Sequence, residues 1–396
     1  MNEFPKIPES EFITRIDNFK KIMEREKIDM VVIYSNFIDP AGVRYFSNFS
    51  AVNESSAMLI PLKGEPILCS GQANHEWSKH TTYAIKDIRI LPEVGEVSGV
   101  EYNIENQLDF SDLFKELKEK YVINKIGVIG DLIFPYIIYN KLINVYPKAE
   151  IISADNLLLE LRIRKSENEL NCIRKASEII SKAFEYTVSR IKTGVTELDI
   201  AADIQSEILR LGAEGNTISW APMIQSGKEN SNLCVNLPSR RRVNESEIIN
   251  LQAGACYEGY NGVISTPLVL GKIPNEIKEA VKVLYEALKI TESVIKPGVT
   301  SVQVFEKYIS FLKDRGYGDY VPYGPLHSLG MLECETPFFS IKREVPIIEN
   351  MTIAIDAYLK NLPWGSFRIE NTYIINSNGV ECVTDFNEKF IGATYK

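Results

Sequence analysis

Two stretches of this chain, Ile191-Lys-Thr-Gly-Val-Thr196 and Ile295-Lys-Pro-Gly-Val-Thr300, have nearly the same sequence. Each is followed by an amphipathic helical pattern that ends at a glycine, Gly212 or Gly316, and the glycine lies 16 positions after the threonine in both copies. In each copy a turn glycine precedes a threonine N-cap, and a second glycine closes the helix. Two copies of one helical unit predict a domain with pseudo-two-fold symmetry. We expect helices outside a curved sheet and a central site built from both halves.

The segment before the first copy predicts a domain boundary. Leu161-Arg-Ile-Arg-Lys-Ser166 precedes a long helical pattern, in which Ser166 is the predicted N-cap and Glu169 completes a capping box. A length of 396 residues also suits two domains better than one core. We therefore predict an N-terminal domain over residues 1–160 and a C-terminal domain over residues 161–396.

The N-terminal part alternates between strand and helix patterns. Apolar residues at helical spacing predict helices over 10–27 and 135–146, and short apolar runs predict strands over 30–34, 57–61, 66–69, 125–130 and near 151. Alternation of this kind is typical of an α/β domain.

Composition and charge exclude several classes of partner. The net charge of −9 disfavours non-specific binding to nucleic acid or to an anionic membrane surface. No apolar run approaches the roughly 20 residues that span a bilayer, and the start of the chain, MNEFPKIPESEF, lacks the pattern of a secretory signal. Six cysteines without CxxC spacing predict free thiols in a reducing cytoplasm. We expect a cytoplasmic protein with a small-molecule substrate.

Several motifs, taken in order, resemble the pita-bread-fold family that includes Xaa-Pro dipeptidase, aminopeptidase P, methionine aminopeptidase and creatinase. They are Val-Arg-Tyr-Phe-Ser-Asn-Phe at 43–49, Gln-Ser-Gly at 225–227, Tyr-Glu-Gly-Tyr at 257–260, His-Ser-Leu-Gly at 327–330 and Phe-Arg-Ile-Glu at 367–370. The resemblance covers nearly the whole chain. It implies an α/β creatinase-like N-terminal domain, an α+β pita-bread C-terminal domain and a homodimer.

The resemblance also implies a changed metal site. Peptidases of this family hold two metal ions with two aspartates, a histidine and two glutamates. Position by position, the aspartates fall on Gln252 and Val263, the histidine on His327, and the glutamates on Asp356 and Glu370. A cation pair needs several anionic oxygens, whereas Gln252 is neutral and Val263 cannot ligate. We therefore expect no dinuclear centre and no cofactor.

The surviving residues His327, Asp356 and Glu370 are the predicted catalytic residues. In one interpretation they hold a single divalent ion, as facial-triad sites do. In the other they carry out metal-independent acid–base chemistry, with His327 as the proton shuttle. Creatinase, which also lacks the aspartates, hydrolyses an amidino C–N bond without a metal.

Further residues are predicted to line the substrate pocket: Gln252, Asn236, Ser265, Cys334 and Glu335. Cys334 falls where the peptidases carry a second histidine, and we interpret it as a buried structural thiol rather than a nucleophile. Glu335 is a candidate general base or a solvated side chain. An ion pair between Arg368 and Glu370 is an alternative explanation for that glutamate.

Three functions therefore remain open from the sequence. The first is a creatinase-like, metal-independent hydrolase that acts on a C–N bond of a small polar metabolite. The second is a metallopeptidase similar to Xaa-Pro dipeptidase, or a related lyase, with one divalent ion on His327, Asp356 and Glu370. The third is a non-catalytic binding protein with the pita-bread fold.

Overall fold

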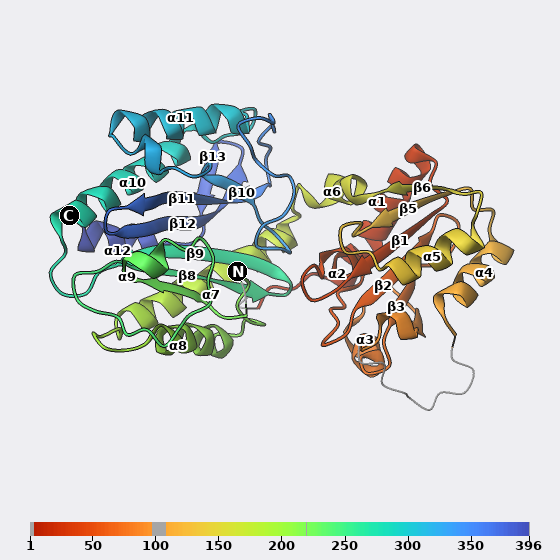
Figure 1. Ribbon diagram of the computed structural model, residues 1–396. Coiled ribbons are helices and arrows are strands. Elements are labelled where there is room, and N and C mark those ends of the chain that lie inside the picture. The colour runs from red at the N-terminus through yellow and green to blue at the C-terminus, as the bar shows by residue number, and fades with distance from the viewer. Residues whose placement is uncertain (1–3, 97–107, 219, 396) are drawn as a thin grey trace. The chain divides into compact units, whose positions relative to one another are not determined.

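The computed structural model in Figure 1 describes residues 4–96, 108–218 and 220–395. The chain forms two compact units, Ile7–Arg162 and Ile163–Lys396, and residues 4–6 belong with the second unit. The division follows Arg162, beside the boundary that the sequence places after residue 160.

The smaller unit is an α/β domain with a mixed six-stranded sheet in the order β4-β3-β2-β1-β5-β6. Its elements are α1 (Glu9–Glu26), β1 (Met30–Ser35), α2 (Ala41–Ser47), β2 (Ser56–Pro61), β3 (Ile67–Ser70), α3 (His75–Thr81), β4 (Asp87–Ile90), η1 (Pro92–Val94), α4 (Phe110–Lys120), β5 (Lys125–Ile129), α5 (Tyr136–Val145), β6 (Glu150–Ser153) and α6 (Asp155–Arg162). The strands and helices predicted from apolar spacing are confirmed to within one or two residues at their ends.

The larger unit is built on a sheet in the order β10-β11-β12-β9-β8-β7, with β13 paired to β12. Its elements are α7 (Glu167–Val188), α8 (Glu197–Arg210), β7 (Met223–Ser226), α9 (Gly227–Ser231), β8 (Ile249–Tyr257), β9 (Tyr260–Leu268), α10 (Asn275–Val294), α11 (Ser301–Asp314), η2 (Gly318–Tyr320), β10 (Leu326–Ser328), β11 (Thr352–Leu362), β12 (Gly365–Asn376), β13 (Gly379–Cys382) and α12 (Phe386–Thr394). Figure 1 shows α7 beside the β8–β9 hairpin with α8 next to it, and α10 beside β11 with α11 next to it. The strand order is symmetric about the junction of β9 and β12, as the repeat predicts.

Both copies of the repeated motif have the predicted local structure. The helices α8 and α11 are each 14 residues long, and each begins with a capping box on its threonine, Thr196 or Thr300. The turn glycines Gly194 and Gly298 have φ values of +90° and +91°, a conformation that side chains with a Cβ rarely adopt. The repeat therefore encodes the same turn and helix twice.

Alternation along β11 and β12 gives the central sheet two different faces. Ile353, Ile355, Ile369 and other odd-numbered residues pack with α10 and α11 in one hydrophobic core. Because successive side chains of a strand point to opposite faces, even-numbered residues such as Asp356 and Glu370 lie on the face away from these helices. The helices thus stabilise one face and leave the other for a site.

Among the described residues, no helix is long and apolar enough to cross a membrane. The six cysteines, all within the described ranges, are free thiols.

Candidate active site

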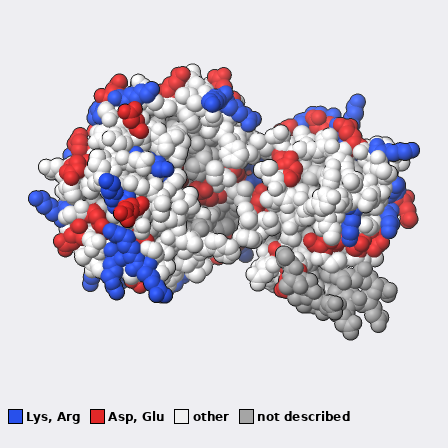
Figure 2. Space-filling model, viewed as in Figure 1, with Lys and Arg blue, Asp and Glu red and all other residues white. Residues whose placement is uncertain are grey.

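The second face of the central sheet carries four predicted site residues in one row. The backbone register pairs Gln252 with Ser265, Ser265 with Glu370, and Glu370 with Asp356, across β8, β9, β12 and β11. Directly paired residues point to the same face of a sheet, so these four side chains lie side by side. Figure 2 shows that the surface of the larger unit is hollowed and that acidic side chains lie within the hollow.

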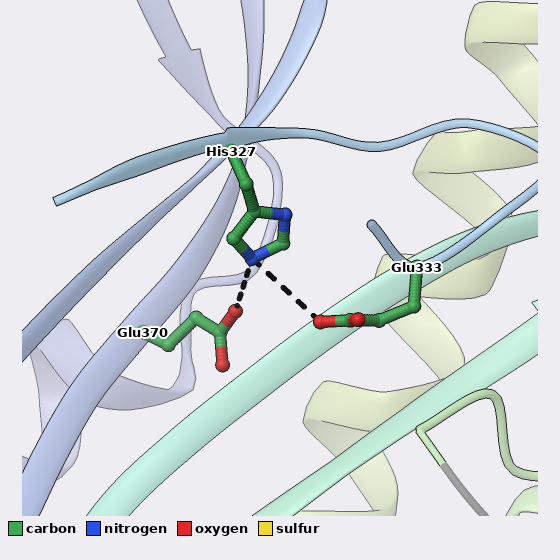
Figure 3. A group of neighbouring side chains, drawn as sticks. All are labelled: His327, Glu333 and Glu370. Carbon is green, nitrogen blue, oxygen red and sulfur yellow. Dashed lines mark hydrogen bonds and ion pairs between the residues drawn. The ribbon is translucent and has the colours of Figure 1, made fainter. Parts of the chain in front are cut away.

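His327 joins this row from the edge strand β10, where it pairs with Ala354 of β11. Its Nε2 atom lies 3.1 Å from Glu370 Oε1 and 3.6 Å from Glu333 Oε1. Figure 3 shows the imidazole edge directed at both carboxylates, with Glu333 reaching in from the loop after β10. One ligand atom from each of the three residues lies within 4.8 Å of the others. Two carboxylates and one imidazole therefore converge on one point.

Neighbouring groups fix the orientation of this cluster. The Nδ1 atom of His327 is 3.2 Å from the Ser328 carbonyl oxygen, which can only accept, so Nδ1 is the donor there. Nε2 is then left to bind an ion or to carry a second proton. The Ser265 hydroxyl donates to Glu370 Oε2 at 2.7 Å. The cluster is thus held from both sides.

The surroundings shift the pKa of each member of the cluster. Burial lowers the pKa of His327, but hydrogen bonds to Cys334 and Glu370 and the charge of Glu333 outweigh burial and raise it well above its usual value. Burial also raises the pKa of Glu333 to about 7, against the attraction of His327. Burial opposes ionisation of Glu370 too, yet its hydrogen bond to His327 and the charges nearby bring its pKa below the usual value. The ion-free cluster therefore consists of a His327–Glu370 ion pair and a carboxyl group that titrates near neutrality.

Asp356 lies outside this cluster, although it stands opposite Glu370. The Tyr323 hydroxyl donates to Asp356 Oδ2 at 2.6 Å, and Arg368 Nη1 lies 3.7 Å from the same oxygen. Burial raises the pKa of Asp356, while Arg368 opposes that shift. The ion pair of Arg368 is thus with Asp356, not with Glu370 as considered from the sequence.

The predicted neutral residues have different positions. Gln252 is buried and donates from Nε2 to Gln225 Oε1 at 3.0 Å. Ser265 contacts Glu370 directly. Asn236 is partly buried, and its Oδ1 has no hydrogen-bond partner in the described structure. Ser265 is therefore the predicted neutral residue that the structure brings into direct contact with the His327 cluster.

The two residues predicted beside them, Cys334 and Glu335, lie on opposite sides of a short hairpin. An isolated bridge pairs Ser328 with Glu335, so Glu335 points with Ser328 while Cys334 points with His327. Glu335 forms a buried ion pair with Lys165 at 3.0 Å. Its carboxylate, a candidate general base from the sequence, is therefore engaged by the lysine. Cys334 is exposed and next to His327, so its interpretation as a buried thiol was wrong.

Sequence reasoning missed Glu333. It lies in a turn without periodic pattern, and nothing in its local sequence distinguishes it from Glu335. Its spacing from His327 was the one available signal, because a carboxylate six residues after a histidine can return to it through a turn.

The residues present decide whether the site could hold two metal ions, as the family resemblance implies for the peptidases, or one. A dinuclear centre does not fit, because Val263 packs in a buried apolar cluster with Leu329 and Ala354, and Gln252 adds no charge. A single divalent ion does fit His327, Glu333 and Glu370. Ligand atoms about 2.0–2.2 Å from one ion lie roughly 3.0–3.5 Å apart, close to the separations observed around His327 Nε2.

The fold and this site define a two-domain hydrolase with a pita-bread catalytic domain. Residues 171–377 match the family described as metallopeptidase family M24, and residues 15–164 match the creatinase/prolidase N-terminal domain. The chain belongs to family M24, and it is a hydrolase of the class that acts on C–N bonds.

Individual relatives support the same assignment. The chain is 28% identical over 378 residues to an Xaa-Pro dipeptidase of Pyrococcus furiosus, covering 93% of this chain and 97% of the relative. The prolidase structure from Pyrococcus horikoshii has a TM-score of 0.80 at 25% identity, covering 94% and 98% of the two chains. The X-Pro aminopeptidase structure from Thermotoga maritima, at 24% identity and a TM-score of 0.81 over 93% and 97% of the chains, shares the fold.

Proposed function

We infer that this protein hydrolyses the C–N bond of small peptide-like substrates, with one divalent ion held by His327, Glu333 and Glu370. The observation that carries this proposal is the convergence of one imidazole and two carboxylates within 4.8 Å. The relatives named above are peptidases, so a peptide bond is a better candidate than the amidino bond of a creatinase-like substrate. The proposal therefore takes the peptidase alternative from the sequence and replaces Asp356 with Glu333 among the predicted ligands.

A divalent ion bound there would polarise the scissile carbonyl group as a Lewis acid. The protein's own groups perform the remaining tasks. Glu370, fixed by Ser265 and His327, holds negative charge at the base of the site. Glu333 is the most exposed of the three side chains, at 27%, and in the ion-free site burial raises the pKa of its carboxyl group to about 7. A bound ion would keep this carboxylate ionised, so Glu333 would contribute negative charge at the most exposed side of the site.

A second candidate is hydrolysis of the same kind of bond without a metal. The His327–Glu370 hydrogen bond of 3.1 Å favours it, because this bond needs a proton on Nε2 and so stabilises an imidazolium. In that mechanism His327 donates a proton to the leaving nitrogen, and Glu333 accepts one from the attacking water. This corresponds to the metal-independent chemistry predicted from the sequence.

Metal analysis of protein purified without chelator tests the proposal. We expect one divalent ion per chain, hydrolysis of short Xaa-Pro peptides, and loss of both after treatment with chelator. Activity that persists in chelator-treated, metal-free protein would instead support the second candidate. Two ions per chain would contradict both.

A matched pair of variants separates a role of Glu333 from a general effect of charge. Glu333→Gln is expected to lower metal occupancy and activity together. Glu344→Gln removes one carboxylate from an exposed loop of the same unit and is expected to change neither. Equal effects of the two substitutions would remove Glu333 from the proposed site.

The assembly and location of the protein stay as sequence-based proposals. A homodimer is proposed from the family resemblance, and a cytoplasmic location is proposed from the content of free thiols. Analytical ultracentrifugation of the purified protein tests the first of these.

A further inference from the structure

Beside the His327 cluster, two buried polar atoms of opposite character have no hydrogen-bond partner. They are the acceptor Oδ1 of Asp356 and the donor Nε of Arg368. Both residues are described in full, and their exposed fractions are 6% and 8%. Buried polar atoms in folded proteins are nearly always hydrogen-bonded, and exceptions mark places where a ligand or water binds.

The two charged groups are close, but they do not form a hydrogen bond of normal length with each other. Arg368 Nη1 lies 3.7 Å from Asp356 Oδ2, whereas charge-assisted N–H···O bonds are roughly 2.7–2.9 Å long. The Tyr323 hydroxyl already occupies Oδ2, so the unpaired oxygen Oδ1 remains for another donor. The ion pair is therefore open, with an acceptor on one partner and a donor on the other.

The guanidinium group is also fixed in place. Its carbon lies 4.4 Å from the centre of the Tyr358 ring, and Nη2 donates to the Cys234 carbonyl oxygen at 3.3 Å. The register pairs Tyr358 with Arg368 across β11 and β12, directly beside the pair of Asp356 with Glu370. The direction of the free N–H group is thus set before any ligand arrives.

The position of this open pair relates it to the cleavage site. Arg368 and Glu370 are two residues apart on one strand and point to the same face, which places them roughly 7 Å apart along the sheet. Asp356, the direct cross-strand partner of Glu370, is nearer, at roughly 5 Å. Consecutive amide groups of an extended chain are roughly 3.5 Å apart, so a substrate with its scissile bond at the His327 cluster would bring the amide after that bond to Asp356 and toward Arg368.

We propose that Asp356 and Arg368 form a recognition subsite for a second, uncleaved amide group of the substrate. An amide group has both an N–H donor and a C=O acceptor. It can therefore donate to Asp356 Oδ1 and accept from Arg368 Nε. The pair has no net charge, so a neutral amide suits it better than an isolated carboxylate or ammonium group. The inference rests on the proposed function and narrows the substrates to amidated or longer peptides.

Binding to a hydrolysis-deficient variant tests the subsite separately from catalysis. The probes are Ala-Pro-NH2 and Ala-Pro, which differ only in a terminal carboxamide or carboxylate, and the protein is the full-length chain with His327→Ala. Isothermal titration calorimetry is expected to give at least tenfold tighter binding of the amide. Equal or tighter binding of the free acid would overturn the subsite.

Asp356→Asn makes the test sharper, because it replaces the acceptor that faces the ligand with a donor. The Tyr323 hydroxyl needs an acceptor, so the Asn oxygen is expected to face Tyr323 and the Asn amino group to face the ligand. In the His327→Ala background this change should abolish or reverse the preference for Ala-Pro-NH2. An unchanged preference would contradict the role of Asp356. Circular dichroism and melting temperature establish that the variant is folded.

Failure of the proposed function and failure of the subsite would give different experimental results. If the amide binds at least tenfold tighter to His327→Ala, but the wild-type protein cleaves neither probe nor Ala-Pro-Ala, the subsite stands and the proposed reaction is wrong. If the wild-type protein cleaves Ala-Pro as fast as Ala-Pro-Ala, and the amide shows no binding advantage, the reaction stands and the subsite is wrong.

Discussion

Lys165 and Glu335 form an ion pair that is almost completely buried. Their charged atoms are 3.0 Å apart, and the side chains are 3% and 4% exposed. The pair packs against Gly330, where a Cβ atom would lie 2.4 Å from the Glu335 carboxylate. It therefore ties the start of the catalytic unit to the hairpin that carries His327 and Glu333.

We predict that Lys165→Ala destabilises the larger unit by about 3–5 kcal/mol, because it leaves a buried carboxylate without its partner. Scanning calorimetry of the full chain should show a lower melting temperature for the transition of that unit. Replacing both partners with apolar residues, Lys165→Met with Glu335→Leu, should cost much less. Lys389→Ala breaks the exposed pair with Asp385 and serves as the control, with an expected change below about 1 kcal/mol. A similar loss of stability in Lys165→Ala and Lys389→Ala would contradict this account.

Much of the fold follows from local sequence. The capping boxes at Thr196 and Thr300 and the glycines before them repeat the same chemistry, so both helices could be placed from the sequence. The row from Gln252 to Asp356 was foreseen as a shared site, but only through resemblance, because its register depends on strand pairing.

The part of the site that escaped prediction depends on contacts distant in sequence. Glu333 meets Glu370 because β10, β11 and β12 are neighbours, which no local pattern encodes. Whether Glu333, Cys334 or Glu335 points to His327 depends on the bridge between Ser328 and Glu335. The orientation of Asp356 likewise depends on Tyr323, which comes from a loop of irregular sequence.

Metal affinity should rise with pH. The pKa of Glu333 is about 7, and the pKa of His327 is raised well above its usual value. Both groups therefore hold protons in acid solution, and those protons compete with a divalent ion. We expect Mn²⁺ to bind at least tenfold more tightly at pH 8 than at pH 6, as measured by electron paramagnetic resonance titration. The dependence should be weaker in Glu333→Gln. An affinity that does not change with pH would exclude these residues as ligands.

The same pKa shift predicts how the stability of the metal-free protein depends on pH. The folded state holds the Glu333 proton up to about pH 7, whereas the unfolded chain releases it near 4.5. Between these values the folded state binds more protons, so its stability falls as pH rises. After allowance for the partial exposure of Glu333, we expect the free energy of unfolding of the wild-type protein to fall over this pH range by about 1–2 kcal/mol more than that of Glu333→Gln. Urea unfolding in the presence of chelator at pH 5 and pH 7.5 measures this change in the free energy of unfolding. The same change with pH in both proteins would contradict the raised pKa of Glu333.

Cys334 should be the cysteine whose alkylation inactivates the enzyme. Its side chain is exposed beside His327, whereas Cys69 and Cys172 are buried. A carbamidomethyl group on Cys334 would obstruct the substrate near the cluster. We expect iodoacetamide to modify Cys334 first, as followed by peptide mass spectrometry, with activity lost in proportion. Cys256→Ala should be inactivated like the wild-type protein. Persistence of activity after complete modification of Cys334 would show that the thiol lies away from the substrate.

Restoring the two family aspartates tests why a dinuclear centre does not fit. Val263 is completely buried among apolar side chains, so Val263→Asp alone should destabilise the metal-free unit by about 3 kcal/mol or more. With Gln252→Asp added, the two carboxylates lie on neighbouring strands of the same face and supply the charge that a second cation needs. We expect the double variant to bind two Mn²⁺ ions per chain instead of one, and the ions to restore much of the lost stability, as measured by elemental analysis and calorimetry. Gln252→Asn, which keeps the charge unchanged, should still bind one. A double variant that folds and still binds one ion would mean that Asp356, bound to Tyr323 and Arg368, also prevents a second metal from binding.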